Sequence, residues 1–373
     1  MVKILPKGVY IHIPFCRRKC PYCDFYSVVA DDNKIHEYAV SLIRNISGFD
    51  SKNAEIDTIY FGGGTPSLMS SDDVGNIIDA VRQSFNLLSN AEITLEANPC
   101  TVSFDKLCQF KEAGINRISF GVQSAQDNEL SSLGRLHDFS MAEQAVMNAK
   151  AAGFNNISCD LMIGTPKQTL SSLEKSIISL SSLGIQHISA YMLKIEEGTA
   201  YDCDEIRRSV ADEDTISDMY LFMCQTLESL GYKQYEISNF SIPGYESCHN
   251  MKYWQGNDYI GFGPDAHSLW NGKRFFVSPD LDEYINNESQ KVIIEDASPD
   301  ALEEYIMLSL RLTQGINLKE LTSKGGDSQA LLKAAQPFIS HGYVVSDADR
   351  VYLTPKGFLL SNEIILKLIM SQS

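Results

Sequence analysis

The chain has 373 residues, of which 44% are hydrophobic and 21% charged, as is typical of a soluble globular protein with room for one large domain and a smaller one. Its formal net charge of −17 argues against broad nucleic-acid binding. The N-terminus lacks the apolar run of a signal peptide, and no stretch approaches the ~18 apolar residues of a membrane span, so we expect a cytoplasmic protein with reduced thiols and no integral membrane segment.

Strand-like and helix-like segments alternate through the first half of the chain. Ser71 and the two aspartates after it predict the start of one helix, and Gly114, Gly153 and Gly184 predict the ends of three others. Six strands in βα alternation imply parallel pairing with right-handed crossovers, and the number favours a barrel of six units rather than eight. The predicted strands are Val9–Ile13, Thr58–Phe61, Glu92–Leu95, Arg117–Phe120, Ile157–Ile163 and His187–Met192, and the helices between them are Asn33–Ser47, Ser71–Phe85, Ser103–Ala113, Ser140–Ala152 and Leu170–Leu183.

The second half changes in character. A helical pattern over Asp214–Leu230 precedes a glycine- and aromatic-rich stretch, Tyr232–Trp270, which is typical of loops with short strands. From about Pro299 the pattern predicts a small domain resembling a winged helix. Its expected elements are helices at Leu302–Leu312 and Gln329–Ser340 and a hairpin of Tyr343–Asp347 with Arg350–Leu353. We therefore predict an α/β fold: a partial (β/α)6 TIM-like barrel over residues 1–230, a barrel-completing region over 231–295 and a small, helical C-terminal domain over 296–373.

The most informative motif is the CxxxCxxC run of Cys16, Cys20 and Cys23. Three thiolates in one short loop can hold three corners of a cubane iron–sulfur cluster, which leaves the fourth iron open to a small molecule. Structural zinc instead prefers paired knuckles that supply four ligands. A disulfide framework is disfavoured, because 9 cysteines in 373 residues are too sparse for a secreted, cross-linked scaffold. The spacing therefore favours an iron–sulfur site.

Polar or glycine-rich features follow the other predicted strands, at the edge where a parallel β/α barrel gathers its chemistry. Gly62–Gly64 follows the second strand, Glu96 ends the third and Gln123 follows the fourth. Each feature also has a plain structural interpretation as a tight turn, a solvated strand end or a surface residue. Asp160, within an apolar strand, is harder to explain in that way, because a buried carboxylate needs a partner.

Together these residues identify a resemblance. The cysteine motif, followed by GGGTP, LEANP, GVQS and DLMIGTP, resembles the radical S-adenosylmethionine superfamily over residues of about 8–270. The similarity is closest to the branch of oxygen-independent coproporphyrinogen III oxidases and HemW-type haem chaperones, and the C-terminal domain fits the same branch. The resemblance implies a 4Fe–4S cluster on the three cysteines, with S-adenosylmethionine at the open iron. The implied cofactor contacts are Tyr10, Tyr22, Gly63, Gly64, Thr65, Glu96, Gln123, Arg135 and Asp160, with Asp160 suited to ribose hydroxyls and Arg135 to a carboxylate.

Two features separate the chaperones from the oxidases. The oxidases carry a fourth cysteine two residues after the third, where this chain has Phe25. The hexapeptide from His249 to Trp254 matches the HNxxYW signature of the chaperones, and a neutral imidazole is a usual axial ligand of haem iron. The neighbouring Cys248 is a weaker candidate for haem ligation or attachment. A histidine in a loop beside core aromatics is the structural alternative.

The resemblance thus implies a protein that binds haem through His249 and transfers it to acceptor haemoproteins, with an electron donor for the cluster and compatibility with a homodimer. The first alternative is a coproporphyrinogen III oxidase that converts two propionates to vinyls, and the second is a radical enzyme for an unrelated small substrate. The sequence leaves open the identity of the acceptor, covalent attachment of haem and cleavage of S-adenosylmethionine.

Overall fold

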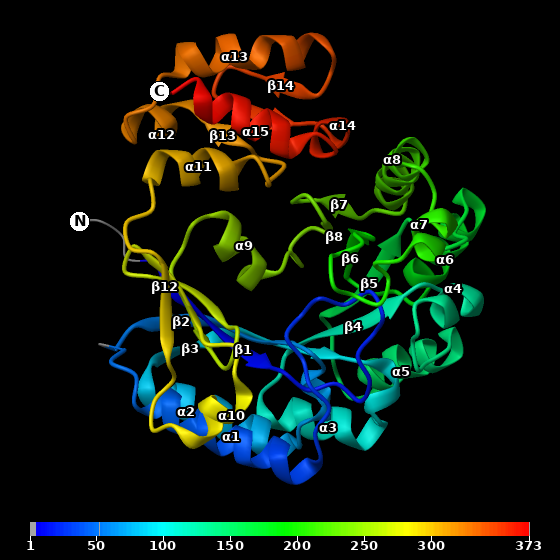
Figure 1. Cartoon of the computed structure of the whole chain (residues 1–373), viewed down its shortest axis with the longest axis vertical. Coiled ribbons are helices and arrows are strands. Elements are labelled where there is room, and N and C mark those ends of the chain that lie inside the picture. The colour runs from blue at the N-terminus through cyan, green and yellow to red at the C-terminus, as the bar shows by residue number, and fades with distance from the viewer. Residues whose placement is uncertain (1–4, 52, 373) are drawn as a thin grey trace.

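The computed structural model describes residues 5–51 and 53–372, and its first half contains the six predicted β/α units (Figure 1). Each of the six strands runs parallel to the next, as predicted. The strands are β1 (Lys7–Ile13), β2 (Glu55–Gly63), β3 (Asn86–Ala97), β4 (Arg117–Gln123), β5 (Ile157–Ile163) and β6 (His187–Met192).

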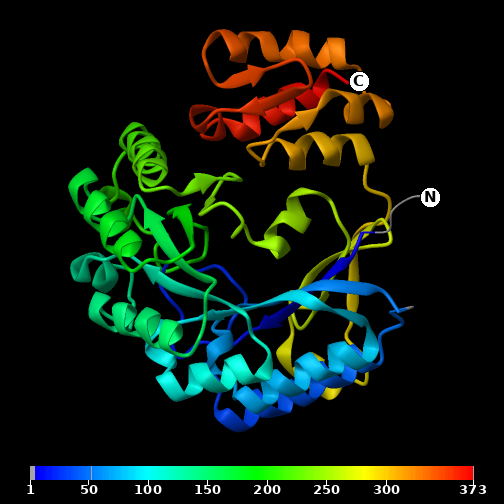
Figure 2. The same ribbon diagram turned by 180° about the vertical axis from the view of Figure 1, so that it is seen from behind.

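Helices cover the outer, convex side of this curved sheet (Figures 1 and 2). Their starts follow ordinary capping chemistry: the Asp31 carboxylate accepts the N–H of Lys34, and the Ser70 hydroxyl accepts that of Asp73. Gly114 ends a helix at φ 112°, where glycine is favoured. The helices are α1 (Asp32–Ser47), α2 (Ser71–Ser84), α3 (Phe104–Ala113), α4 (Asp127–Ser132), α5 (Phe139–Ala151) and α6 (Leu170–Ser182), with short 3-10 turns at Pro66–Leu68 and Pro99–Thr101.

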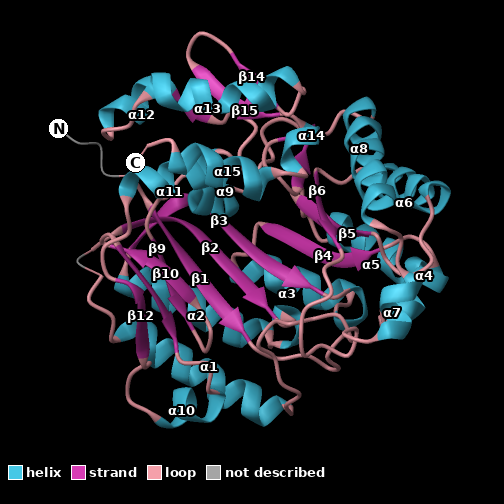
Figure 3. Cartoon of the chain, turned by 45° about the horizontal axis from the view of Figure 1, so that its top comes forward, coloured by secondary structure: helices cyan, strands magenta, loops and turns pink. Residues whose placement is uncertain are grey.

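Further strands extend the sheet at both ends without closing it. The order is β12-β11-β10-β9-β1-β2-β3-β4-β5-β6-β8-β7, with β9 parallel to β1 and β8 antiparallel to β6. The partial barrel is therefore an open, twelve-stranded sheet over the described residues (Figure 3). The added elements are α7 (Asp204–Ser209), α8 (Glu213–Ser229), β7 (Lys233–Gln234), β8 (Asn239–Ser241), α9 (Cys248–Trp254), β9 (Tyr259–Phe262), β10 (His267–Trp270), β11 (Lys273–Val277), α10 (Leu281–Asn286) and β12 (Val292–Asp296).

Alternate residues of the central strands divide the sheet into an apolar and a polar face. Ile59, Leu95 and Phe120 are fully buried, as expected of the face that packs against the outer helices. Their neighbours along the strands are polar, so the concave face is lined with hydroxyl, carboxylate, imidazole and guanidinium groups. These residues include Thr58, Tyr60, Thr94, Glu96, Arg117, Ser119, Ser158, Asp160 and His187.

The C-terminal domain lies across the concave side of the sheet, with α9 between the two (Figures 1 and 2). Backbone hydrogen bonds join them: Ile237 donates to Arg311 at 2.9 Å and Thr313 donates to Tyr235 at 3.1 Å. The predicted hairpin is present as β14 and β15, and the division at residue 296 stays a prediction. The domain contains α11 (Ala301–Ser309), β13 (Ile316–Asn317), α12 (Leu318–Ser323), α13 (Ser328–Ser340), β14 (Val344–Ser346), β15 (Arg350–Leu353), α14 (Pro355–Phe358) and α15 (Ser361–Met370).

Candidate functional site

The loop that carries the three cysteines follows β1 and is closed at its base by the backbone. Val28 donates its N–H to the carbonyl of Pro14 at 2.7 Å, and Cys16 donates to the carbonyl of Val28 at 3.0 Å. Within the loop, the N–H of Cys23 donates to the carbonyl of Cys20 at 3.1 Å. All three cysteines are half-buried. The sulfurs are thus held by one fixed loop and remain accessible to a ligand.

Two side chains from other elements approach the cysteine sulfurs. Thr65 Oγ1 lies 3.6 Å from the Sγ of Cys16, and Arg135 Nη1 lies 3.6 Å from the Sγ of Cys20. Burial raises the pKa of Cys23, and the nearby thiols of Cys20 and Cys16 raise it further. Bound iron would offset this crowding of negative charge, and the two donors suit thiolate acceptors. The loop therefore fits an iron–sulfur cluster.

The glycine run at the end of β2 is required for its close packing against the cysteine loop. Gly63 has φ 110°, and a Cβ atom there would lie 2.6 Å from Cε1 of His12. Gly64 donates its N–H to the carbonyl of Ile13 at 2.8 Å, and its Cβ would lie 2.6 Å from the carbonyl oxygen of Phe15. A side chain at Gly64 would therefore displace the backbone that leads into the cysteines, and one at Gly63 would displace the ring of His12.

Glu96 connects this glycine run to the polar face of the sheet. Its carboxylate accepts a hydrogen bond from the Tyr60 hydroxyl at 2.7 Å and from the N–H of Gly63 at 3.3 Å. Burial raises the pKa of Glu96 to about 7, opposed by the Tyr60 hydrogen bond. The group is held in place and titrates near neutrality, so a ligand ammonium would find a carboxylate that ionises readily.

Three further predicted contacts surround Gly121 on β4. A Cβ atom at Gly121 would lie 3.1 Å from Nε2 of Gln123, 3.2 Å from Nη2 of Arg135 and 3.9 Å from Oδ2 of Asp160. Gln123 has φ 75°, a left-handed conformation that is uncommon outside glycine and concentrates at functional sites. Burial raises the pKa of Asp160 to about 6, while hydrogen bonds from serines, including Ser119, lower it.

Arg135 bridges this group and the cysteine loop. It donates from Nη2 to the carbonyl of Gly121 at 2.6 Å and from Nη1 to the Tyr22 hydroxyl at 3.4 Å. Its Nε is buried without a hydrogen-bond partner among the described residues. An unpaired, buried N–H beside the cysteine loop fits a ligand carboxylate.

Tyr10 lies on the same face, with its ring stacked on Tyr60 at a centroid distance of 6.3 Å. Its hydroxyl lies 3.0 Å from Nδ1 of His12. Through Tyr60 it adjoins Glu96, so the structure places the nine predicted contacts in two groups that meet the cysteine loop. One group is formed by Tyr10, Gly63, Gly64, Thr65 and Glu96, and the other by Tyr22, Gln123, Arg135 and Asp160.

His249 lies deeper, on α9, and is fully buried. Its Nδ1 is 2.8 Å from the Thr58 hydroxyl, and its Nε2 is 2.8 Å from the Tyr253 hydroxyl. The ring stacks on Tyr60 at 5.2 Å. Burial, and next the charge of Lys252, lower the pKa of His249 to about 3, so the imidazole is neutral. In this conformation both ring nitrogens are engaged within the protein.

The other members of the hexapeptide are also committed to local contacts. Lys252 is buried, forms a 2.6 Å ion pair with Asp57 and donates to the carbonyl of Pro6. Partial burial, and next the charge of Glu92, raise the pKa of Cys248 to about 11, so this thiol is protonated at neutral pH. The hexapeptide thus fixes α9 to the N-terminal ends of β1 and β2.

Sequence reasoning missed Tyr60, Ser119 and Arg117 as parts of the site. Arg117 is 2% exposed, and its Nε is buried without a hydrogen-bond partner among the described residues. Its charge lowers the pKa of both Glu96 and Asp160. The period-two alternation within the predicted strands was the available signal, because it places these side chains on the face of Glu96 and Asp160.

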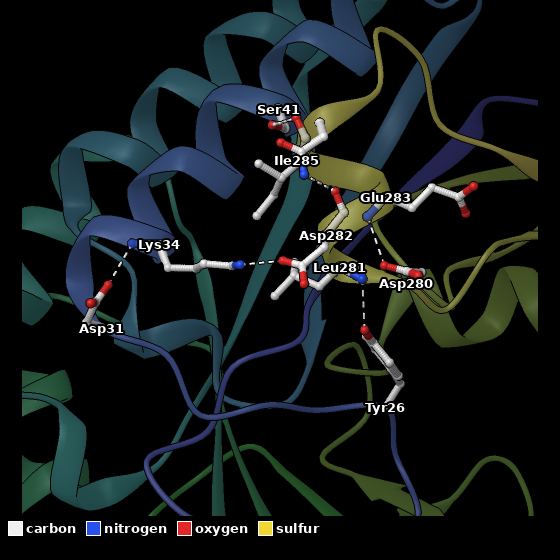
Figure 4. A network of polar contacts seen from close by, with 10 residues as sticks. Tyr26, Asp31, Lys34, Ser41, Asp280, Leu281, Asp282, Glu283 and Ile285 are labelled. Atoms are coloured by element: carbon white, nitrogen blue, oxygen red, sulfur yellow. Dashed lines mark hydrogen bonds and ion pairs between the residues drawn. The ribbon is translucent and has the colours of Figure 1, made fainter.

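A separate cavity of about 780 Å³ lies beside the chain that leaves the cysteine loop, between residues 26–37 and 279–282. None of the predicted cofactor contacts is among the described residues that line it. The polar contacts here tie the exit of the cysteine loop to α10. Figure 4 shows them: the N–H of Leu281 donates to the Tyr26 hydroxyl at 2.9 Å, and Lys34 forms an ion pair with Asp282.

Comparison with known proteins identifies the family of this chain. Residues 10–179 match the model of the radical SAM superfamily, and residues 297–360 match that of the HemN C-terminal domain. The protein described as heme chaperone HemW of Bacillus subtilis is 35% identical over 96% of this chain and 98% of its own length. The chain belongs to the HemW family. The HemW protein of Escherichia coli is 34% identical, with 98% of each chain covered.

A solved structure shares the fold of this HemW family member. The radical SAM enzyme coproporphyrinogen III oxidase (HemN) from Escherichia coli superposes with a TM-score of 0.85, at 20% identity, over 98% of this chain and 90% of its own. The predicted α/β radical SAM fold with a HemN-like C-terminal domain is therefore confirmed. Among the described helices, none has the length and apolar character needed to cross a membrane.

Proposed function

We propose that this protein binds haem and delivers it to acceptor haemoproteins in the cytoplasm. The observation that carries the proposal is the similarity, over nearly the whole chain, to relatives described as heme chaperone HemW. Phe25 supports it, because this residue, which is 61% exposed, stands where the oxidases have a fourth cysteine. The alternative is a coproporphyrinogen III oxidase, whose solved representative has the same fold.

We further propose that Cys16, Cys20 and Cys23 hold a 4Fe–4S cluster, with S-adenosylmethionine at the same rim. Arg135 would bind the carboxylate of the ligand through its unpaired Nε, and the ionised Glu96 would bind its ammonium group. Asp160, aligned by Ser119, would accept hydrogen bonds from ribose hydroxyls. The chemistry that the bound cluster supplies is one-electron reduction, for which an electron donor is a further expected partner.

In this proposal His249 is the axial ligand of haem iron. The imidazole is already neutral, as iron ligation requires. Its Nε2 contacts the Tyr253 hydroxyl and its Nδ1 the Thr58 hydroxyl, so iron can bind only after one of these hydrogen bonds is broken. Since the ring is fully buried, haem binding must also draw α9 away from the concave face of the sheet.

The experiment is a haem titration of the full chain, reconstituted anaerobically with iron and sulfide. His249→Ala should abolish the Soret band while the iron content of the cluster stays at the wild-type level. His187→Ala is the matched control, because His187 is equally buried and also bonded at both ring nitrogens, to Ser158 and Tyr235. An unchanged Soret band in His249→Ala, or equal loss in both variants, contradicts the assignment of His249.

Turnover of coproporphyrinogen III by the same sample distinguishes the two functions. Haem binding without decarboxylation supports the chaperone, whereas conversion of propionates to vinyls would make this protein an oxidase despite Phe25.

A further inference from the structure

Thr94 and Arg117 lie side by side on the concave face of the sheet, because β3 and β4 pair in a register that sets them opposite each other. Thr94 is fully buried and Arg117 is 2% exposed. The Oγ1 of Thr94 and the Nε of Arg117 are both buried without a hydrogen-bond partner among the described residues. Since buried polar groups are usually paired, two neighbouring donors of this kind suit an acceptor group of a ligand.

A carboxylate is the acceptor that this pair fits best. The guanidinium of Arg117 is always charged, and a buried cation is stabilised by an anion beside it. The Thr94 hydroxyl can donate to the same carboxylate. The protein's own carboxylates on this face, Glu92, Glu96 and Asp160, each accept hydrogen bonds from other groups. The pair is therefore suited to a carboxylate that a ligand supplies.

The position of the pair relative to His249 indicates which ligand this is. Tyr60, Thr94 and Arg117 form one row across three neighbouring strands, and the ring of His249 stacks on Tyr60 at 5.2 Å. Adjacent strands are about 4.8 Å apart, so the backbone of Arg117 lies roughly 10 Å from that of Tyr60. Haem carries its iron at the centre of the macrocycle and its propionates at one edge. With the iron bound at the His249 end of the row, a propionate can reach the Arg117 end.

The movement that frees His249 also opens this row. The helix α9 is tied to β3 by the N–H of His249, which donates to Oε1 of Glu92 at 3.2 Å. Glu92 lies two residues before Thr94, so the two side chains are on the same face of the strand. Withdrawal of α9, which iron ligation requires, would break this hydrogen bond and open the concave face beside Thr94.

We propose that Thr94 and Arg117 bind a propionate of haem, with the Thr94 hydroxyl and the Arg117 Nε as the two donors. The proposal rests on the proposed function, because it adds a second anchor for the haem that His249 binds. Lys252, the cation of the hexapeptide, is already paired with Asp57. A single axial ligand leaves the macrocycle free to rotate about the bond between iron and nitrogen, and the propionate contact would fix its orientation.

The test compares haem with its dimethyl ester, which lacks the propionate charges, in equilibrium titrations of the full, reconstituted chain. The wild type should bind haem about ten- to a hundredfold more tightly than the ester, as expected of a charge-assisted hydrogen bond. Arg117→Gln should lose this preference and bind the ester like the wild type. Arg44→Gln should keep the preference. It is the matched control, because Arg44 lies on α1 at the convex side and donates to the carbonyls of Ile285 and Asn287.

Thr94→Val removes the other donor while keeping the shape of the side chain. It should weaken haem binding about tenfold, with ester binding less affected. The free energy of unfolding in urea should not fall, because the hydroxyl has no partner among the described residues.

The outcomes separate this site from the proposed function. Equal affinity of the wild type for haem and ester would overturn the propionate site alone, as would an Arg117→Gln variant that keeps the preference or loses both affinities alike. If Arg117→Gln does not fold, an unchanged haem affinity in Thr94→Val overturns the site. A wild type that binds no haem would overturn the proposed function, and this site with it.

Discussion

Replacing Gly64 with alanine should displace the cysteine loop, because a methyl group there has no space. The new Cβ would lie 2.6 Å from the carbonyl oxygen of Phe15 and 3.0 Å from that of Ile13, whereas ordinary contact begins at 3.4 Å. Both obstacles are backbone atoms of the segment that leads into Cys16, so neither can rotate away. Overpacking of this kind costs about 1–3 kcal/mol, and obstruction by backbone favours the upper part of that range.

The matched control is Gly75→Ala, at the fifth position of α2, where the nearest atom to a new Cβ is 3.6 Å away. That change should stabilise the protein by about 0.8–1 kcal/mol, because alanine favours the helix. Urea unfolding measures both free energies, and iron per chain after anaerobic reconstitution reports on the loop. If Gly64→Ala took up iron and unfolded like Gly75→Ala, close packing of the glycine run against the cysteine loop would not be what positions the cluster.

Three further outcomes are expected. Affinity for S-adenosylmethionine, measured by calorimetry, should fall about tenfold per pH unit below the pKa of Glu96, which is about 7. The reason is that the ammonium group of the ligand prefers the ionised carboxylate. An affinity that does not change with pH would contradict this role of Glu96. Arg117→Gln should move the midpoint of this pH dependence to higher pH, because loss of the cation raises the pKa of Glu96. Arg117→Lys keeps the charge and should leave the midpoint in place. A uniform loss of affinity in both variants would indicate that Arg117 is purely structural. Lys252→Ala should lower the free energy of unfolding, measured in urea, by about 1–3 kcal/mol, because it leaves Asp57 partly buried without its ion pair. Lys194→Ala, which removes an exposed ion pair, should leave the free energy of unfolding unchanged. Equal effects of the two variants would refute a stabilising role of the buried ion pair.

The fold was predictable where periodicity was strong and long. The six parallel strands and the β14–β15 hairpin lie within their predicted ranges or extend them by a few residues. The helix α9 was missed, since seven residues give too short a window for an amphipathic pattern and the segment was expected to be loop. The strands β9–β12 are only four or five residues long, and their position beside β1 depends on pairing between distant parts of the chain.

The candidate site shows the same division. Residues that follow strand ends were predictable, because parallel strands bring those ends together. The environment of His249 was not, since it depends on Thr58, a partner 191 residues away in the sequence. A motif identifies the residue but not the groups that its two ring nitrogens contact.

The pairing of β1 has a consequence for how the protein is made. On one side β1 pairs with β2, which follows soon after it, but on the other side its partner is β9, about 250 residues later. A ribosome adding roughly 5–20 residues per second needs some tens of seconds to synthesise that span. During this time the strand that leads into the cysteines is paired along one edge alone. We therefore expect cluster assembly on a nascent chain to wait until β9 has left the ribosome.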